Sequence, residues 1–307
     1  MPQGSVLGPK LFILYINDLC NVSNLVKYVL FADDTNIFKS GNNVNELCNE
    51  ISHELTKVNT WFNVNKLSLN VSKTNFMLFG RSKKAENIKI EINNSEIERV
   101  SVTKFLGVLI DDKLQWKQQI NHVKNKLSKC ISIIYKAREF LNKDALILLY
   151  NSLFLPHLNY CSEVWANTYK TSLNKIVVLQ KRVIRIIHRV DRLSHTSLLF
   201  HKMSSLNFLD IVRFKSLMVM FKAYTNGLPK TLQSYFVLNS MGENYYMRST
   251  NKFKISYTRT SLKAKCVTVV GPKLWNELPK SITSLKTQNG FKRALKHYLV
   301  NQYLHNG

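Results

Sequence analysis

The sequence predicts an α+β protein, in which a short N-terminal part with a β-hairpin is followed by a longer, mainly helical part. Apolar residues run from Tyr28 up to Asp33-Asp34, and the strand pattern resumes at Ile37 and Phe38, which is typical of a tight hairpin with two carboxylates at its turn. From residue 111 onward, apolar residues recur instead at helical spacing. The balance of charge changes in the same region, so we expect the two parts to differ in function as well as in structure.

The formal net charge of +25 is unevenly distributed along the 307 residues. Residues 1–110 contain 12 Lys and Arg against 10 Asp and Glu, a net charge of +2, whereas residues 111–307 contain 32 against 9, a net charge of +23. An excess of this size favours a polyanionic partner, most often a nucleic acid, and the alternative is a basic surface that only faces solvent. The length and the 45% hydrophobic content suffice for two folded domains.

The five cysteines are scattered, without the Cys-x-x-Cys spacing of zinc modules, and they suggest no disulfide framework. We therefore expect an intracellular protein, in the cytoplasm or the nucleus, and no secretory leader. The most apolar later stretch, residues 145–158, is interrupted by Asn151, Ser152, Pro156 and His157. This predicts a buried helix and no membrane span.

In the first 110 residues, helical spacing predicts a helix over residues 10–22, with Leu11, Leu14, Tyr15 and Leu19 on one face. A second helix is predicted over residues 44–64. Short strands are expected at residues 76–79, 88–92, 97–100 and 105–110.

Beyond residue 110, apolar residues recur from Trp116 to Ile134 and predict a long helix with lysines on its polar positions. Asp111-Asp112 reads as its N-terminal cap, not as a metal site. Further helices are predicted over residues 143–156, 171–192, 206–226 and 288–304, the first of them ending near Pro156. Residues 238–265 suggest weak strands or a basic loop.

Four segments occur in an order and spacing that resembles the palm of a reverse transcriptase. They are Pro2-Gln-Gly4, Phe31-Ala-Asp-Asp34, Asn70-x-x-Lys73-Thr74 and Phe105-Leu-Gly107. The chain is most similar to polymerases of non-LTR, LINE-type retrotransposons of the jockey and CR1 kinds, and segments 157–161, 179–182 and 271–279 are similar to the region after the polymerase there. The resemblance implies a partial palm over 1–110, a thumb-like helical region over 111–192, and a basic C-terminal region of uncertain fold over 193–307.

The adjacent carboxylates of Asp33 and Asp34 are the strongest candidates for chemistry. Two neighbouring carboxylates repel each other, and a hard divalent cation with oxygen ligands relieves that repulsion. The alternative is ordinary, because Asp is a favoured turn residue and most such pairs are solvated. The resemblance implies that both residues hold Mg²⁺ or Mn²⁺ for two-metal nucleotidyl transfer, with Asp33 contacting both ions.

The resemblance also assigns roles beside the carboxylates. Lys73 would lie near the departing pyrophosphate as a catalytic residue, although an exposed loop lysine is the plain alternative. Gly4 suits close approach of the backbone to a ligand, and the alternative is a simple Gly/Pro turn before a helix. The residues implied to contact the nucleotide and template are Gln3, Gly4, Phe31 and Ala32, and those of the primer grip are Phe105, Leu106 and Gly107.

The implied activity is RNA-directed DNA polymerisation, with an RNA template, a DNA primer and deoxynucleoside triphosphates as partners. In the family, a third Asp from a strand upstream of the Pro-Gln-Gly turn completes the metal site, and basic fingers hold the triphosphate. We therefore expect this chain to be inactive alone. The alternatives are a non-catalytic nucleic-acid-binding protein derived from a retroelement, and a degraded copy without a cellular role.

Residues 176–192 separate apolar and basic side chains onto opposite faces of a helix. At 100° per residue, Ile176, Leu179, Val183, Ile186, Ile187 and Val190 share one face. The other face carries the candidates for nucleic-acid binding, Lys181, Arg182, Arg185, Arg189 and Arg192. Guanidinium groups bind phosphate oxygens bidentately, so this row predicts contact with a nucleic-acid backbone, and a solvated face is the alternative.

Overall fold

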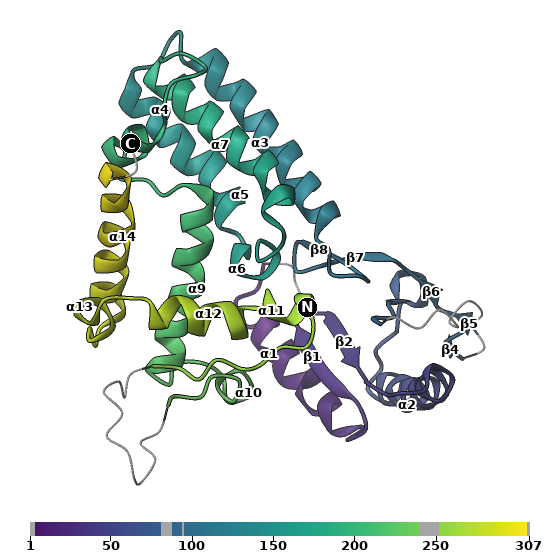
Figure 1. Ribbon diagram of the computed structural model, residues 1–307. Coiled ribbons are helices and arrows are strands. Elements are labelled where there is room, and N and C mark those ends of the chain that lie inside the picture. Colours follow the sequence, from purple (N-terminus) through teal and green to yellow (C-terminus); the bar gives the residue numbers. More distant parts are fainter. Residues whose placement is uncertain (1–3, 81–87, 94, 240–251, 306–307) are drawn as a thin grey trace, which may run out of the picture. The chain divides into compact units, whose positions relative to one another are not determined.

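The computed structural model describes residues 4–80, 88–93, 95–239 and 252–305. The chain divides into two compact units, Met1–Thr103 and Lys104–Gly307 (Figure 1). The α+β class is confirmed, since small two-stranded sheets are combined with many helices. The predicted division into three parts at residues 110 and 192 stays a prediction.

The first unit contains the hairpin and the other short strands. Its elements are α1 (Gly8–Ile16), the 3₁₀ helix η1 (Asn17–Asn21), β1 (Lys27–Phe31), β2 (Asp34–Phe38), α2 (Val44–Val64), the 3₁₀ helix η2 (Val71–Lys73), β3 (Asn75–Phe76), β4 (Glu91–Ile92), β5 (Ser95–Glu96) and β6 (Glu98–Arg99). β1 pairs with β2 and β4 with β5, both antiparallel, whereas β3 pairs with β6 in parallel.

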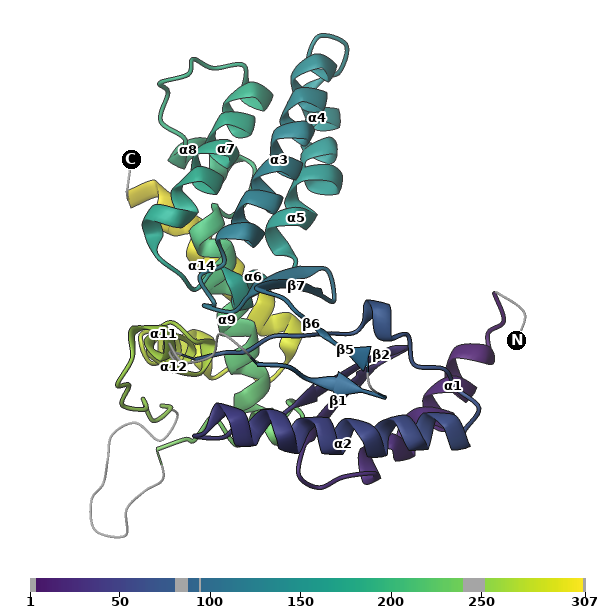
Figure 2. The same ribbon diagram turned by 90° about the vertical axis from the view of Figure 1, so that its right-hand side faces the viewer.

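One face of the β1–β2 hairpin packs against α1 and α2 (Figure 2). Alternation places Tyr28, Leu30 and Ile37 on this face, beside a small cluster of buried residues that comprises Ile16, Leu19, Val58 and Phe62. The predicted buried face of residues 10–22 is wrong except for Leu19. Leu11, Leu14 and Tyr15 are exposed, because the helix turns into η1 at Asn17 and buries Ile16 instead.

The helix predicted over residues 44–64 is confirmed as α2. The side chain of Asn43 caps it by accepting a hydrogen bond from the backbone N–H of Asn45, at 3.0 Å. The helix contributes to both cores of this unit, since Cys48 packs in a second cluster with Ile90, Ile92 and Ile97. α2 therefore connects the hairpin side of the unit to its short strands.

The other strands of this unit are shorter than the sequence predicts. Of the predicted strand 76–79, only Asn75–Phe76 pairs, and the predicted strands 88–92 and 97–100 reduce to two-residue segments. The apolar run 105–110 is not one strand. It contains the tight turn of a hairpin between β7 (Val102–Phe105) and β8 (Val108–Asp111), because Leu106 and Gly107 both have positive φ, 44° and 82°.

The second unit is helical apart from that hairpin. Its helices are α3 (Lys117–Ala137), α4 (Lys143–Leu149), the π-helix η3 (Tyr150–Phe154), α5 (Leu155–Asn159), α6 (Ser162–Trp165), α7 (Lys170–His188), α8 (Ser197–Lys202), α9 (Phe208–Tyr224), α10 (Lys230–Gln233), α11 (Ser261–Ala264), α12 (Val267–Asn276), α13 (Lys280–Thr283) and α14 (Gln288–His305). Only an isolated bridge between Leu238 and Phe253 represents the strands suggested for residues 238–265, of which 240–251 lie outside the described residues.

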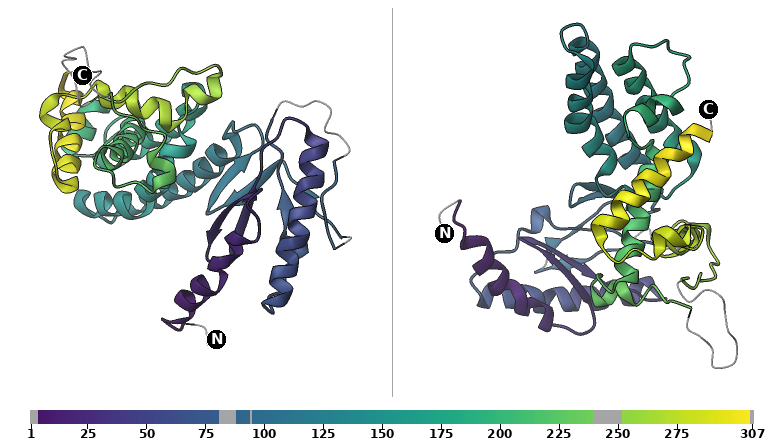
Figure 3. Two further views of the ribbon diagram at one scale, coloured as in Figure 1. Left: turned by 90° about the horizontal axis from the view of Figure 1, so that it is seen from below. Right: turned by 90° about the vertical axis from the view of Figure 1, so that its left-hand side faces the viewer.

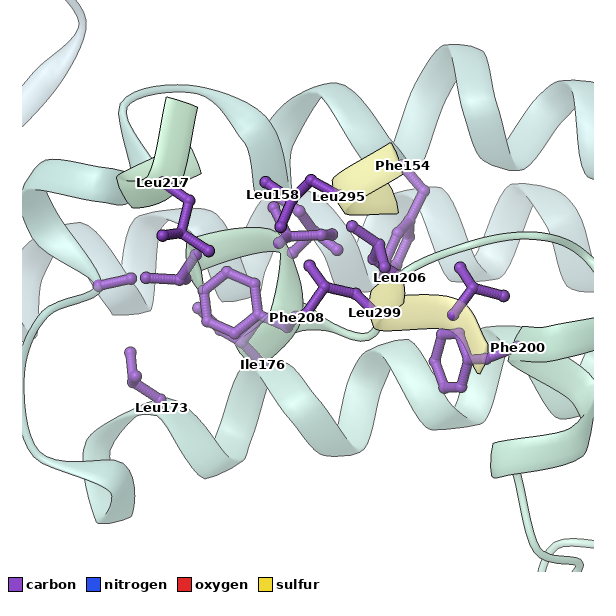
Figure 4. Packing of buried hydrophobic residues seen from close by; sticks show 14 of the residues in the cluster. Phe154, Leu158, Leu173, Ile176, Phe200, Leu206, Phe208, Leu217, Leu295 and Leu299 are labelled. Carbon is purple, nitrogen blue, oxygen red and sulfur yellow. The ribbon is translucent and has the colours of Figure 1, made fainter. Parts of the chain in front are cut away.

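A single continuous core holds this unit together, from Val108 in β8 to Tyr303 in α14. Figure 4 shows Phe208 of α9 lying among side chains of three other elements, Leu158, Ile176 and Leu299. The last helix, α14, runs alongside α9 (Figure 1 and the right-hand view of Figure 3). It is held there by stacked rings, with Phe291 centred 4.5 Å from Phe221.

Two predicted helix ends in this unit are wrong. Pro156 does not end its helix. The π-helical turn η3 precedes it, and the proline lies in the first turn of α5, a position that tolerates a missing N–H. α7 ends at His188, and not at residue 192, because Arg189 adopts a left-handed conformation with φ of 53°.

All five cysteines are free thiols. Within the described ranges, no helix is both long enough and apolar enough to cross a membrane.

Candidate functional site

The predicted hairpin turn carries Asp33 and Asp34 at its tip. Phe31 pairs with Asp34, so only Ala32 and Asp33 form the turn, and Asp34 is the first residue of β2. Ala32 has φ of 50°, a left-handed conformation that costs a residue with a β-carbon free energy. The twist of the strands favours such turns, and strained backbone of this kind is concentrated at functional sites.

The outer face of the hairpin is apolar and exposed around the carboxylates. Because paired residues share a face, the exposed side chains of Phe31 and Asp34 lie side by side. Val29 and Phe38 are exposed on the same face, at 45% and 48%. Phe31 is 58% exposed, which is unusual for a large apolar side chain in a folded unit. The residues implied to contact a nucleotide and to hold a metal are therefore adjacent and accessible.

The donor set at this tip fits part of a divalent-cation site. Both carboxylates are exposed and lie at adjacent positions on a paired hairpin, which suits Mg²⁺ held largely by water and phosphate oxygens. Among the described residues, no group of three or more His, Cys, Asp and Glu side chains is placed to hold a metal. Asp33 and Asp34 can thus supply two of the ligands, and the remaining ligands have to come from elsewhere.

The segment that contains Lys73 packs on the same cluster as the hairpin. Leu67 and Leu69 join Leu30 and Ile37 there, which anchors the start of the Asn-x-x-Lys-Thr segment. The rest of the segment is the short helix η2. No hydrogen bond or ion pair between described residues joins the exposed Lys73 to either carboxylate.

Asn70 explains the spacing of this segment. Its side-chain oxygen accepts hydrogen bonds from the hydroxyl of Ser72, at 2.7 Å, and from the backbone N–H of Lys73, at 3.2 Å. Its carbonyl accepts from the hydroxyl of Thr74, at 2.9 Å. These residue types at this spacing thus build a capped turn that presents Lys73 at its end.

The other implied nucleotide contacts are only partly described. Gln3 lies outside the described residues. Gly4 is exposed with φ of 89°, and a β-carbon built there would meet no atom within 4 Å. The conformation therefore requires glycine, whereas the surrounding space does not.

The turn implied to be the primer grip is braced by a residue that sequence reasoning did not single out. Tyr160 donates its hydroxyl to the carbonyl of Leu106, at 2.6 Å. A β-carbon at Gly107 would lie 3.4 Å from the same ring. The carbonyl of Tyr160 in turn accepts from the indole N–H of Trp165, at 2.8 Å. The similarity of segment 157–161 to retrotransposon polymerases was the only signal available for it.

Asp111 has a structural role, as the sequence suggests, but not as the cap of a helix. It is 5% exposed, and its carboxylate accepts the backbone N–H groups of Gln115 and Trp116, at 2.9 and 2.7 Å. These bonds stabilise the turn before α3, whose own N-cap position is Trp116. Both carboxylate oxygens of Asp111 are thus engaged by backbone N–H groups.

The structure separates the predicted basic row into two groups. Arg185 donates its Nε–H to the carbonyl of Ser194, at 2.8 Å, and Arg189 donates to the carbonyl of Arg138, at 2.7 Å. Both therefore stabilise the end of α7 as well as carrying charge. The exposed side chains without such a bond in the described part of the chain are Lys181, Arg182 and Arg192, the last lying beyond the helix. The buried stripe is confirmed for Ile176, Val183, Ile186 and Ile187.

Comparison with known proteins agrees with this arrangement. Residues 1–110 match the family model described as reverse transcriptase (RNA-dependent DNA polymerase), and this range contains the hairpin, the Lys73 segment and the β7–β8 turn. The match covers about a third of the chain, and over this range the chain is similar to the reverse transcriptase family.

The curated relatives to which the chain is similar come from transposons and other mobile elements. The chain is 27% identical over 197 residues to the RNA-directed DNA polymerase from mobile element jockey of Drosophila funebris, covering 61% of this chain and 21% of that protein. It is 25% identical over 194 residues to the "Probable RNA-directed DNA polymerase from transposon X-element" of Drosophila melanogaster, with the same coverage. The corresponding protein from transposon BS is 28% identical over 201 residues, covering 61% of this chain and 22% of that protein.

The chain spans about a fifth of the length of these relatives. No solved structure matches the chain. Because 61% of this chain is covered, the similarity to these polymerases extends beyond residue 110.

Proposed function

We propose that this chain acts within a non-LTR retrotransposon polymerase, in the addition of deoxynucleotides to a DNA primer on an RNA template. The observation that carries the proposal is the Phe31–Asp34 turn, a tight and strained hairpin tip with two exposed carboxylates, inside the matched region. Residues 1–110 serve as part of the palm and the helices after it as the thumb.

Each named residue has a role in this proposal. Asp33 and Asp34 would hold divalent cations, which when bound would activate the primer hydroxyl and stabilise the leaving group. Lys73 neutralises charge on the departing pyrophosphate, since it is exposed at the end of the capped turn. The Leu106–Gly107 turn contacts the primer, and Gln3, Gly4, Phe31 and Ala32 contact the nucleotide and template.

The 307-residue chain by itself is expected to give no primer extension. Two-metal transfer requires carboxylates from several rigid elements, and the described residues provide a pair on one hairpin. We would assay the chain on an RNA template with Mg²⁺ or Mn²⁺ and all four deoxynucleotides, alone and fused behind the preceding polymerase segment of the jockey relative. Extension by the fusion should disappear in Asp33→Asn. Extension by the chain alone, lost in Asp33→Ala, would contradict the expected inactivity.

Metal binding at the hairpin can be tested without activity. Two exposed carboxylates should bind Mn²⁺ only in the millimolar range, because such ions keep most of their water. Paramagnetic broadening of amide signals should centre on residues 31–35 and vanish in the variant Asp33→Asn/Asp34→Asn. Asp111→Asn is a suitable control for folding, since that carboxylate is engaged by the backbone. Broadening centred elsewhere would refute the site.

The basic surface of α7 should contribute to nucleic-acid affinity. If Lys181, Arg182 and Arg192 contact phosphates, replacing all three with Gln should reduce the slope of log affinity against log salt by about 2–3. The helix should persist, because Gln is a good helix former and the buried stripe is unchanged. The matched control removes three exposed lysines elsewhere in the unit, Lys286, Lys292 and Lys296. An equal change of slope in both variants would indicate a general charge effect only.

The charge of the second unit also supports a second candidate, a nucleic-acid-binding protein without catalysis. The net charge of +23 over residues 111–307 is sufficient for binding on its own. The fusion experiment separates the candidates, since a catalytically competent palm should restore extension and a structural remnant should not.

A further inference from the structure

A groove lies between α3 and α7, the two long helices that pack against each other in the second unit. It has a volume of about 290 Å³. Ile131 and Leu179 provide its apolar part, and Ser128 and Ser132 contribute hydroxyl-bearing side chains. Tyr135, Lys136 and Arg182 complete its lining. The groove therefore combines an aromatic ring, apolar surface and two cations.

The ring of Tyr135 is held in place and remains accessible. Ser128, Ser132 and Tyr135 follow one another at helical spacing on the same side of α3. The guanidinium of Arg138 lies over the ring, 4.3 Å from its centroid, in a cation–π contact. Tyr135 is nevertheless 46% exposed. One ring face is thus covered by a cation, and the groove retains an aromatic surface.

The charges around the ring favour an anion. None of the described residues that line the groove is acidic, and Glu139, in the turn after α3, is not among them. The carbonyl of Arg138 accepts the hydrogen bond from Arg189, which fixes the end of α7 beside the end of α3. Lys136 and Arg182 therefore line the groove beside the Tyr135 ring, and Arg138 adds a third cation over that ring.

We propose that this groove binds one unpaired nucleotide of a single-stranded nucleic acid, with its base against Tyr135 and a neighbouring phosphate on Arg182 and Lys136. The proposal rests on the proposed function, and it specifies that the groove binds the single-stranded form of nucleic acid. Stacking on an aromatic side chain within a basic groove is a general way to hold single strands, because every base has a π-face.

Size and chemistry distinguish this occupant from a duplex. Small-ligand pockets measure roughly 300–1,000 Å³, so a groove of about 290 Å³ matches one planar ring and not a double helix. A paired base is also stacked on its neighbours and cannot present a face to Tyr135. A duplex would use the cations alone, and the ring would then be irrelevant to its affinity.

The test compares a single-stranded oligonucleotide with a blunt duplex of the same sequence, using the full chain. Stacking is measured directly by photocrosslinking an oligonucleotide that carries 5-bromouridine, followed by mass spectrometry of the crosslinked peptide. Tyr135→Ala should weaken binding of the single strand about 5- to 100-fold and leave duplex affinity within about 2-fold. Tyr135→Phe keeps the ring and should retain both the affinity and the crosslink.

Two further variants separate binding in the groove from a general loss of aromatic surface. Ser132→Leu fills the groove without removing the ring, and should also weaken binding of the single strand alone. Tyr235→Ala removes an exposed tyrosine, 62% accessible, from another part of the unit and should change neither affinity. Circular dichroism and the melting temperature show whether each variant is folded.

The proposal is overturned if Tyr135→Ala weakens both forms equally, if Ser132→Leu has no effect, or if the crosslink maps outside α3 and α7. None of these measurements requires catalysis or the hairpin carboxylates. Failure of the groove thus leaves the polymerase proposal unaffected, and an inactive polymerase fusion leaves the groove unaffected.

Discussion

The two units of this chain achieve folding by different means. Residues 1–103 bury their apolar side chains in two small clusters around α2, with strands of two to five residues. Residues 104–307 bury theirs in one continuous core that extends from β8 to α14. Charge follows the same division, with 11 Lys and Arg against 10 Asp and Glu in the first unit and 33 against 9 in the second.

The two units differ in the groups that they expose: many positive charges on the second unit, and an apolar face beside two carboxylates on the first. A large core tolerates many like charges on its surface, because burial outweighs their mutual repulsion. The first unit has less apolar burial, yet it leaves Phe31, Val29 and Phe38 accessible beside the carboxylates. An exposed apolar face in a small unit favours a binding role over a stabilising one.

The largest expected effect comes from disrupting the core of the second unit. Phe208→Ala should lower its free energy of unfolding by about 3–5 kcal/mol, because Phe208 is fully buried and stacks on Trp165, 5.6 Å between ring centroids. Hydrogen exchange in low denaturant should show the loss of protection throughout α3, α7 and α9.

The matched change in the first unit is Leu19→Ala, which should lower the free energy of unfolding by about 2–3 kcal/mol. This is near the lower limit for a buried leucine, because a small cluster collapses more readily around the deleted atoms. Its effect should be confined to α1, α2 and the hairpin. Equal loss of protection across both units in either variant would contradict the separation of their cores.

Acid should affect the two units in opposite directions. In the first unit, the hydrogen bond from Lys57, at 2.8 Å, lowers the pKa of Glu54 to about 2, from an ordinary value of 4.5. The unfolded chain therefore takes up this proton first, and the stabilisation present above pH 4.5 is lost as the pH falls toward 2. We expect a loss of about 1–2 kcal/mol, moderated by the exposed Lys57 amino group.

In the second unit, burial raises the pKa of Asp210, which accepts a hydrogen bond from the hydroxyl of Tyr303. Protonation of this carboxyl therefore stabilises the fold below its ordinary pKa, and that contribution is lost as the pH rises through the raised value. Glu54→Gln should remove the pH dependence of stability in the first unit, and Asp210→Asn that in the second. Hydrogen exchange measured between pH 7 and pH 3 checks each variant. If the stability of both units falls in parallel with pH in every variant, these assignments are wrong.

The smallest effects are expected at the β7–β8 turn. Gly107→Ala forces a left-handed conformation on alanine, with its β-carbon in van der Waals contact with the ring of Tyr160, so it should cost about 1–2 kcal/mol. Tyr160→Phe removes only the hydroxyl that binds the Leu106 carbonyl and should cost about 1 kcal/mol.

The turn also provides a functional comparison. If it contacts the primer, Tyr160→Phe in the polymerase fusion should raise the KM for primer more than it lowers kcat. Phe140→Leu, an exposed site beyond α3, serves as the control. A decrease of kcat alone would argue against a positioning role for Tyr160.

Local patterns in the sequence determined much of the candidate site. The apolar residues on both sides of Asp33-Asp34 predicted the hairpin, and helical spacing predicted α2 to its ends and most of the buried stripe of α7. These features depend on residues close together in the chain, whose periodicity directly reflects which side is buried. The segments around Lys73 and Gly107 were recognisable for the same reason, since each is a local turn.

Tertiary structure decided the rest, because it depends on which distant residues meet. Burial of Ile16 in place of Leu11 follows from contact with α2, some forty positions later. The brace on the Leu106 carbonyl comes from Tyr160, 54 positions away, and Arg189 is engaged by a carbonyl 51 positions before it. The α3–α7 groove likewise combines Tyr135 with Arg182. Periodicity identifies the side of a helix that is buried, but only packing determines the partner, and hence which aromatic and basic groups form a site.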